Sequence, residues 1–421
     1  MKKTIPHLVC ADKDGNILED PQLLMLARQG NSLALPRPDD LIPLPESSDL
    51  FLLPARKALG LDPDTGQIQV VDALAVAGFA SPGHTLSGTA AYTVKDGAPR
   101  LPLYAYSAVG YMNDKFWITA RLVDHDQRQV FSTISPSEIT LKAHEMLKKY
   151  PDNRLIQHLA GCAINSCCPA ARNLVLGRYE APLPTSRSCN AGCLGCISKQ
   201  PRNSGFQATQ KRIAFTPSPQ EIAQVMEIHC SRVKKPILSF GQGCEGEPLT
   251  RTDLICQAVS MVRKTITHAT ININTNGSMP ESVAKLKDSG VDSVRVSLNS
   301  ADPTLYQSYY RPADYSFEDV RQFIQQARKH SLFVSLNLLY FPGVTDTESQ
   351  IAPLIDLIGQ TRTDFIQLRN LNLDPDLYLD LVRDTDLGPQ TGLKNFIKRI
   401  KKECPWTGLG YFNPYLENKT I

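Results

Sequence analysis

The second half of the chain alternates short apolar segments with amphipathic ones, and this alternation restricts the fold more than any other feature of the 421 residues. In the segment 317–330, apolar residues recur at the i, i+3, i+4 spacing of an amphipathic helix. Strands that alternate with helices pair in parallel through right-handed crossovers. The expected strands are 183–188, 236–241, 270–274, 293–298, 333–339 and 365–371, and the expected helices are 219–232, 253–264, 281–289, 317–330 and 348–358.

This pattern predicts an α/β fold with a partial (β/α)6 TIM-like barrel, because six units are too few for a full eight-stranded one. In such barrels the functional side chains lie at the carboxyl ends of the strands. Before the barrel, short β-branched runs alternate with turn residues, and Asn113-Asp114 between two apolar runs favours a hairpin. The Pro-rich segment 35–45 is expected to be an irregular loop. The expected divisions are a β-rich N-terminal accessory domain at 1–134, a helical linker at 135–180, the barrel at 181–385, and a C-terminal helix and tail at 386–421.

Composition and charge argue against several kinds of partner. A net charge of +3 does not indicate a nucleic acid or an acidic membrane surface. The sequence contains no apolar stretch of the ~20 residues needed to span a bilayer, and no apolar run of a signal peptide follows the first residues. We therefore expect a cytoplasmic protein, in which clusters among the eleven cysteines indicate metal binding or catalysis more than disulfides.

Three cysteines, Cys189, Cys193 and Cys196, stand as C-N-A-G-C-L-G-C at the start of the expected barrel. Thiolates are soft anionic ligands that suit iron–sulfur clusters. Three of them at CxxxCxxC spacing can hold three irons of a [4Fe–4S] cube and leave the fourth iron open to another ligand. The alternatives are a zinc site without a visible fourth ligand, since structural zinc takes four, or three buried thiols.

The segment after the second expected strand contains Gly246, Glu247 and Pro248. With the cysteine loop one βα unit earlier, the chain resembles the radical S-adenosylmethionine (SAM) superfamily over roughly residues 180–375. The resemblance implies that Glu247 and the nearby main chain contact the amino group of SAM. The chain departs from the family pattern in two places. Glu245 replaces the first glycine of the family motif, and Gly195 stands where many members have an aromatic residue near adenine, so another group must cover the adenine.

Polar residues on the later strands are further candidates. The family uses a Ser or Thr and a following polar residue on the fourth strand for the ribose or carboxylate of SAM. Ser297 and Asn299 match this pattern by resemblance, and Arg295 shares their face of the strand. Arg295 either pairs with the carboxylate of SAM or with Glu247, or fills a layer of the barrel. The other candidates are Asn274 and Asn337 for the barrel mouth, and Gln367, Arg369, Tyr306, Tyr309 and Tyr310 for substrate contacts.

The resemblance implies an oxygen-sensitive radical SAM enzyme. Such an enzyme cleaves SAM reductively at its [4Fe–4S] cluster to a 5′-deoxyadenosyl radical, which abstracts hydrogen from a substrate. The reductant would be ferredoxin or flavodoxin, and the substrate a small molecule, peptide or protein. The chain looks like the branch that contains molybdenum-cofactor, peptide-maturing and glycyl-radical-activating enzymes.

Two alternatives come from other classes of protein. One is an iron–sulfur electron-transfer or scaffold protein on the same fold. The other is a zinc-stabilised RNA-binding protein that uses the basic segment 394–403. A basic run at helical spacing is more often the solvated face of a packed helix, so nucleic acid is not the expected partner.

The remaining cysteines near the barrel leave alternatives open. Cys162, Cys167 and Cys168 form a CxxxxCC pattern that could supply ligands to an auxiliary iron–sulfur cluster, or they are buried thiols. Cys244, three residues before Glu247, is a candidate hydrogen-atom donor, an auxiliary ligand, or a small buried apolar residue.

Overall fold

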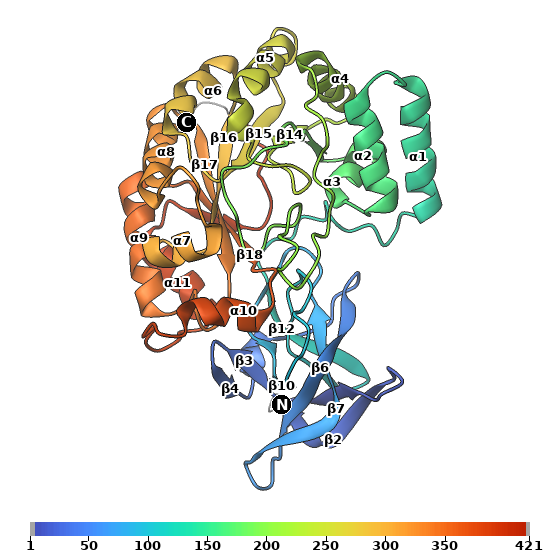
Figure 1. Ribbon diagram of the computed structural model, residues 1–421, viewed down its shortest axis with the longest axis vertical. Helices are drawn as coiled ribbons and strands as arrows, with labels where there is room; N and C mark the ends of the chain where they lie inside the picture. The colour runs from blue at the N-terminus through green and yellow to red at the C-terminus, as the bar shows by residue number, and fades with distance from the viewer. Residues whose placement is uncertain (1–4, 418–421) are drawn as a thin grey trace.

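The computed structural model describes residues 5–417. It consists of an antiparallel N-terminal domain, three linker helices, and a curved parallel sheet covered by helices (Figure 1). No helix within residues 5–417 has the length and apolarity needed to cross a bilayer.

The N-terminal domain is β-rich, as predicted. The expected hairpin is present: Met112 pairs with Lys115, and Asn113 and Asp114 take the positive φ angles (54° and 57°) of a tight two-residue turn. The segment 35–45 is not wholly irregular, because residues 41–43 form a short strand that pairs with residues 117–119. The elements are β1 (His7–Ala11), β2 (Ile17–Met25), β3 (Ala27–Gln29), β4 (Ser32–Ala34), η1 (Pro38–Asp40), β5 (Leu41–Pro43), β6 (Asp49–Leu61), β7 (Ile68–Phe79), β8 (His84–Leu86), β9 (Thr89–Ala90), β10 (Tyr92–Val94), β11 (Val109–Met112) and β12 (Lys115–Leu122).

Three helices connect this domain to the barrel, each with a local start signal. Ser135 caps the first by accepting from the amide of Glu138, and Asn153 caps the second by accepting from the amide of Ile156. The third has proline at its first position, where a missing N–H costs little. The helices are α1 (Pro136–Lys149), α2 (Arg154–Asn165) and α3 (Pro169–Leu176).

The barrel sheet is parallel throughout, with strands in chain order from β13 to β19. The predicted partial barrel is therefore confirmed, with one strand more than expected, since the short β19 pairs beside β18. Its strands are β13 (Glu180–Pro182), β14 (Ile237–Phe240), β15 (Thr270–Thr275), β16 (Ser293–Leu298), β17 (Phe333–Tyr340), β18 (Phe365–Asn370) and β19 (Gly408–Gly410).

The helices pack outside this sheet and bury their apolar faces on it, and Figure 1 shows α5, α6, α8 and α9 along its outer side. Val320, Phe323, Ile324 and Ala327 of α8 are fully buried, as the periodicity predicts. The helices of the barrel half are α4 (Pro219–Cys230), η2 (Pro248–Arg251), α5 (Thr252–Arg263), η3 (Pro280–Ser282), α6 (Val283–Ser289), α7 (Pro303–Tyr310), α8 (Phe317–Lys329), α9 (Glu348–Thr361), α10 (Pro375–Leu379), η4 (Asp380–Val382) and α11 (Leu393–Glu403).

The first strand differs from its expected bounds. It ends at Pro182, and the segment 183–188 continues without regular pairing. The reason is that the amides of Thr185 and Ser186 donate to the carboxylate of Glu245 instead of to a neighbouring strand.

The N-terminal domain docks below the carboxyl ends of the last strands. Arg56 forms an ion pair of 3.0 Å with Asp374, and both side chains are 3% exposed. The hydroxyl of Thr85 donates to the carbonyl of Leu368 on β18 at 2.7 Å. These buried polar contacts fix the accessory domain against the end of the barrel where active sites lie.

Candidate active site

A cavity of about 440 Å³ lies at the carboxyl ends of the barrel strands. Pockets of this size hold small molecules and cofactors. Cys168 of the predicted auxiliary set lies at its wall, and so do six residues predicted to bind the cluster or SAM: Cys193, Cys196, Asn274, Arg295, Ser297 and Asn337.

The cysteine loop, residues 189–196, is held by main-chain hydrogen bonds to the end of α7. The amide of Gly192 donates to the carbonyl of Tyr310, and the amide of Leu194 donates to the carbonyl of Tyr309, each at 3.0 Å. Asn190 of the loop accepts from the side chain of Asn276, beyond β15, at 2.9 Å. These hydrogen bonds fix the main chain of the loop against α7 and the segment after β15.

The three thiols suit a metal cluster better than a single zinc ion. Within residues 5–417, Cys189, Cys193 and Cys196 do not form a set whose sulfur atoms all lie within 4.8 Å of one another. One tetrahedral zinc ion with Zn–S bonds of ~2.3 Å needs sulfurs only ~3.8 Å apart. Burial raises the pKa of Cys193, so bound cations would have to stabilise its thiolate. The guanidinium of Arg212 supports Cys196, with Nη2 3.7 Å from its sulfur.

The G-E-P motif fastens the segment that leads into the cysteine loop. The amide of Gly246 donates to the carbonyl of Ser186 at 2.7 Å, and the amide of Glu247 donates to the carbonyl of Ser188 at 2.9 Å. A Cβ atom on Gly246 would lie 1.9 Å from the carbonyl oxygen of Ser188. Only glycine allows this approach. Pro248 is buried and begins the short helix η2.

Glu247 is buried, and its carboxylate accepts hydrogen bonds from three neighbouring residues. It accepts from the hydroxyl of Thr275 at 2.5 Å, the amide of Asn276 at 2.8 Å and the amide of Leu249 at 3.0 Å. Burial raises the pKa of Glu247 to about 7, against the lowering effect of these donors. The carboxylate thus holds the turn Thr275-Asn276-Gly277 at the end of β15, and Glu247 does not line the cavity.

The loop after β14 presents its main chain to the cavity at Gly241, Gln242 and Gly243. Glu245, which departs from the family motif, supports this loop. Its carboxylate accepts from the amides of Gln242 and Thr185, each at 2.7 Å. No sequence pattern marks this role, because both donors are main-chain groups brought together by the fold.

Asn299 does not share the cavity with Arg295 and Ser297. Its amide donates to the carbonyl of Leu305 and to the hydroxyl of Tyr378, each at 3.3 Å, and it is 1% exposed. The expected shared face stops before Asn299 because β16 ends at Leu298, and the SAM contact expected of Asn299 stays a prediction.

Three residues of the cavity wall each carry a buried atom without a hydrogen-bond partner among residues 5–417: Arg295 Nε, Tyr310 Oη and Asn337 Oδ1. A buried polar group without a partner costs about 1–3 kcal/mol. Neighbouring atoms cover all three, so a ligand in the cavity would contact them only after the side chains turn toward it.

Tyr309 fills the space beside Gly195. Its hydroxyl oxygen lies 2.5 Å from the position of a Cβ atom on Gly195, and both residues line the cavity. Among the other substrate candidates, Arg369 lines the cavity, whereas Gln367 and Tyr306 are fully buried and are not part of its wall.

Arg295 and Arg369 bring two positive charges to the cavity. Arg295 donates to Gln367 at 3.1 Å, and Arg369 donates to the carbonyl of Tyr411 at 3.1 Å, so each has a neutral acceptor. Burial, and then the charge of Arg369, lower the pKa of Arg295 to about 10. The pair favours an anionic group at this wall.

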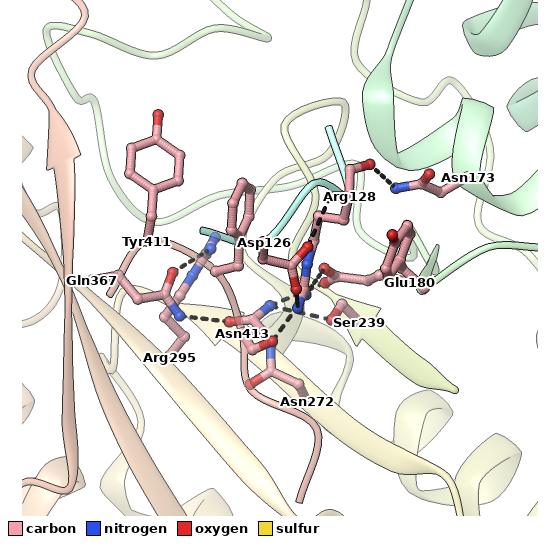
Figure 2. Close-up of polar contacts among 12 residues, drawn as sticks. Asp126, Arg128, Asn173, Glu180, Ser239, Asn272, Arg295, Gln367, Tyr411 and Asn413 are labelled. Carbon is pink, nitrogen blue, oxygen red and sulfur yellow. Dashed lines mark hydrogen bonds and ion pairs between the residues drawn. The ribbon is translucent and has the colours of Figure 1, made fainter. Parts of the chain in front are cut away.

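A polar network closes the open side of the barrel (Figure 2). Asn413 donates to Glu180 on β13 at 3.0 Å and accepts from Gln367 on β18 at 2.8 Å, and Arg128 donates to its carbonyl at 2.9 Å. Figure 2 shows Asn413 between Gln367 on one side and Glu180 and Ser239 on the other. Segments that precede and follow the barrel strands in the sequence thus complete the cavity.

The cysteines outside the loop are grouped differently from the predicted CxxxxCC set. Cys162 lies beside His158 and Cys244, and Cys167 is exposed and outside this group. Cys244 is 4% exposed and is not part of the cavity wall, so its position does not support a role as hydrogen-atom donor.

Residues 183–355 match the family model described as "Radical SAM superfamily". A protein of Methanocella arvoryzae named "Probable GTP 3',8-cyclase" is 29% identical over 174 residues, which cover 40% of this chain and 50% of that protein. A protein of the same name from Methanocaldococcus jannaschii is 26% identical over 185 residues, covering 41% and 56%. The chain thus spans about half the length of the curated relatives it matches.

Among solved structures, HydG, titled a maturase of the [FeFe]-hydrogenase, aligns with a TM-score of 0.40 and 16% identity, covering 68% of this chain and 67% of that one. The family match agrees with the parallel barrel, the position of the cysteine loop and the cavity beside it. The segment 183–355 of this chain belongs to the radical SAM superfamily.

Proposed function

We propose that this chain is a radical SAM enzyme. In this proposal Cys189, Cys193 and Cys196 hold a [4Fe–4S] cluster, and SAM and an anionic substrate share the adjoining cavity. The observation that carries the proposal is the convergence of Cys193 and Cys196 with polar side chains at one cavity wall.

The residues present fit both cofactors. Soft thiolates are the ligands that iron–sulfur clusters require. Arg295, Tyr310 and Asn337 line the cavity, and their guanidinium, hydroxyl and amide groups are suited to the carboxylate, hydroxyl and amino groups of SAM. When bound, the two cofactors together supply one electron and the organic radical that removes hydrogen from the substrate.

The protein residues then bind and orient the ligands. Tyr309 occupies the space that a side chain at position 195 would fill. We therefore assign to Tyr309 the role of covering the adenine of SAM. Arg295 pairs with the carboxylate of SAM, and Arg369 with an anionic group of the substrate. The main chain of Gly241–Gly243 offers carbonyl acceptors to an ammonium group. Cys189 is exposed, which marks the side where a reductant such as ferredoxin or flavodoxin would approach.

The alternatives receive less support. Helix α11 buries Leu393, Phe396 and Ile400, and its Arg399 pairs with Glu348 at 2.9 Å. Its basic face therefore belongs to a helix packed on the barrel rather than to an RNA contact. An electron-transfer protein on this fold would not need polar side chains around a cavity beside the cluster.

The test is release of 5′-deoxyadenosine from SAM by protein reconstituted with iron and sulfide without oxygen and reduced with dithionite. We expect release from the unchanged chain and none from Cys189→Ala, Cys193→Ala or Cys196→Ala. Cys10→Ala, in the N-terminal domain, is the control and should retain it. An intact cluster without SAM binding would favour the electron-transfer alternative, and a colourless zinc protein would favour the RNA-binding one.

A further inference from the structure

A second group of metal-ligating side chains lies outside the cavity wall. Ligand atoms of His158, Cys162 and Cys244 all lie within 4.8 Å of one another, and no other such set of His, Cys, Asp or Glu occurs in the described part of the chain. His158 and Cys162 are four residues apart on α2, so they share one face of that helix. Cys244 comes from the loop after β14, so the group joins the helical linker to the barrel.

The spacing fits a single tetrahedral ion. Bonds of ~2.3 Å to sulfur and ~2.0–2.1 Å to nitrogen place neighbouring ligand atoms about 3.5 Å apart. The sulfur of Cys162 lies 3.6 Å from Nε2 of His158. Thiolates and imidazole together are ligands that zinc prefers.

We propose that His158, Cys162 and Cys244 bind one zinc ion, separate from the cluster held by Cys189, Cys193 and Cys196. The site reaches solvent, because His158 and Cys162 line an outer hollow of about 570 Å³. Zinc enters from this side. The fourth ligand is water from the hollow, because the thiol of Cys168 is outside the set of mutually close ligand atoms and its residue lines the other cavity.

The ion would lock together two parts that support the active site. Cys244 lies between Gly243, whose main chain lines the cavity, and Glu245, whose carboxylate holds Thr185. The carbonyl of Cys244 also accepts from the amide of Ile213 at 2.7 Å, and this bond ties the segment around Ile213 to the loop after β14. A bond from this loop to α2 therefore stiffens the support of the cysteine loop without contacting substrate.

The test uses the full chain with Cys189, Cys193 and Cys196 all changed to alanine, so that no cluster competes for metal. The protein is purified with reductant, stripped of metal and titrated with Co²⁺ and then Zn²⁺. We expect one equivalent of Co²⁺ with the visible bands of a tetrahedral site and thiolate charge-transfer absorption, displaced by one equivalent of Zn²⁺. The charge-transfer intensity counts the thiolates, and it should be the same in Cys168→Ser.

In this cluster-free background, His158→Ala, Cys162→Ser and Cys244→Ser should each weaken binding more than about 100-fold, since even the partners of zinc ligands contribute 10–100-fold. Cys167→Ser changes an exposed neighbouring thiol and is the matched control, which should bind normally. Circular dichroism of each metal-free variant checks that it is folded. Zinc should also raise the melting temperature of the parent and of Cys167→Ser, but not of the other three.

Stoichiometric binding that is unchanged in folded Cys162→Ser and Cys244→Ser would overturn the proposal. So would the absence of tetrahedral Co²⁺ in the folded parent, or a Cys162–Cys244 disulfide that persists under reductant. None of these readouts depends on SAM cleavage, so the zinc site and the proposed enzyme activity can fail independently.

Discussion

The hydroxyl oxygen of Tyr309 lies 2.5 Å from the point that a Cβ atom on Gly195 would occupy. The residue before the third cysteine thus has no side chain because a tyrosine from α7 already stands in its place. Tyr309 is also buried next to Tyr310 and Tyr378, which hold its ring in position.

Gly195→Ala should weaken SAM binding by about 1–2 kcal/mol, or roughly tenfold, because the new methyl group displaces Tyr309 in a packed wall. Tyr309→Phe removes the clashing oxygen, so the double variant Gly195→Ala/Tyr309→Phe should recover most of the affinity. Calorimetry on the cluster-loaded protein measures both. Equal affinities for Gly195→Ala and the parent would show that Tyr309 does not shape the SAM site.

Gly246→Ala should prevent stable cluster incorporation. A Cβ at this position would lie 1.9 Å from the carbonyl oxygen of Ser188, so the segment before Cys189 must move. The measurement is iron and sulfide content per chain after reconstitution. Gly359→Ala is the control: a Cβ there would meet no atom within 4 Å, and alanine should stabilise α9 by up to about 1 kcal/mol. Normal iron content in Gly246→Ala would contradict a clamp at this glycine.

Asn413→Ala should destabilise the protein by about 2–3 kcal/mol, since Glu180 and Gln367 would each lose a buried partner. The same change should weaken SAM binding, because Asn413 forms part of the cavity wall. Denaturant unfolding gives the stability. Asn395→Ala, at an exposed position on α11, is expected to stay within about 0.5 kcal/mol of the parent. A similar loss in both variants would argue against a specific closing role for Asn413.

The buried pair Arg56–Asp374 should show strong coupling. Asp374→Asn leaves an unpaired buried guanidinium and should cost about 3–5 kcal/mol, whereas adding Arg56→Met should recover part of the loss. A double-mutant cycle on unfolding free energies provides the measurement. Additive effects of the two changes would mean that the pair does not hold the domains together.

The contribution of His229 to stability should fall in mild acid, opposite in sign to that of Glu247, whose raised pKa favours the folded state as pH falls. The side chain of His229 is fully buried, and burial lowers its pKa to about 4, against the usual 6.5. At this position the unfolded chain binds more protons than the folded one between pH 4 and 6.5, so the contribution of His229 to the free energy of unfolding decreases as pH falls through this window, by at most about 3 kcal/mol. The difference in unfolding free energy between the parent and His229→Gln should therefore shift by this amount across the window. A constant difference would assign the acid sensitivity to other groups.

Much of the barrel could be predicted because its strands and helices carry strong local periodicity. The expected fourth strand coincides with β16, Ser293–Leu298, and α8 begins at the expected Phe317. The first strand and β19 could not be delimited. The first strand ends at Pro182, because the amides that follow it donate to the carboxylate of Glu245. The segment Gly408–Gly410 becomes a strand only because β18 lies beside it.

Within the candidate site, spacing and resemblance identified Cys193, Asn274, Arg295 and Asn337, which the structure places at one cavity. They did not anticipate that Asn299 lies outside the cavity wall, because an alternation of faces holds only while the strand lasts. They also missed Glu245 and Asn413, whose roles depend on contacts between segments far apart in the sequence.

Because Asn413 closes the barrel, the cavity can be completed only after the segment that follows β19 has been synthesised. Gln129 reaches the cavity wall from the segment before the barrel and Asn413 from the segment after β19, so the wall is incomplete while the ribosome is still making the segments after β18. Until Asn413 is made, its hydrogen bonds to Glu180 and Gln367 cannot form. A cluster inserted before Asn413 leaves the ribosome would bind beside an incomplete cavity wall. Insertion of the cluster after translation avoids this.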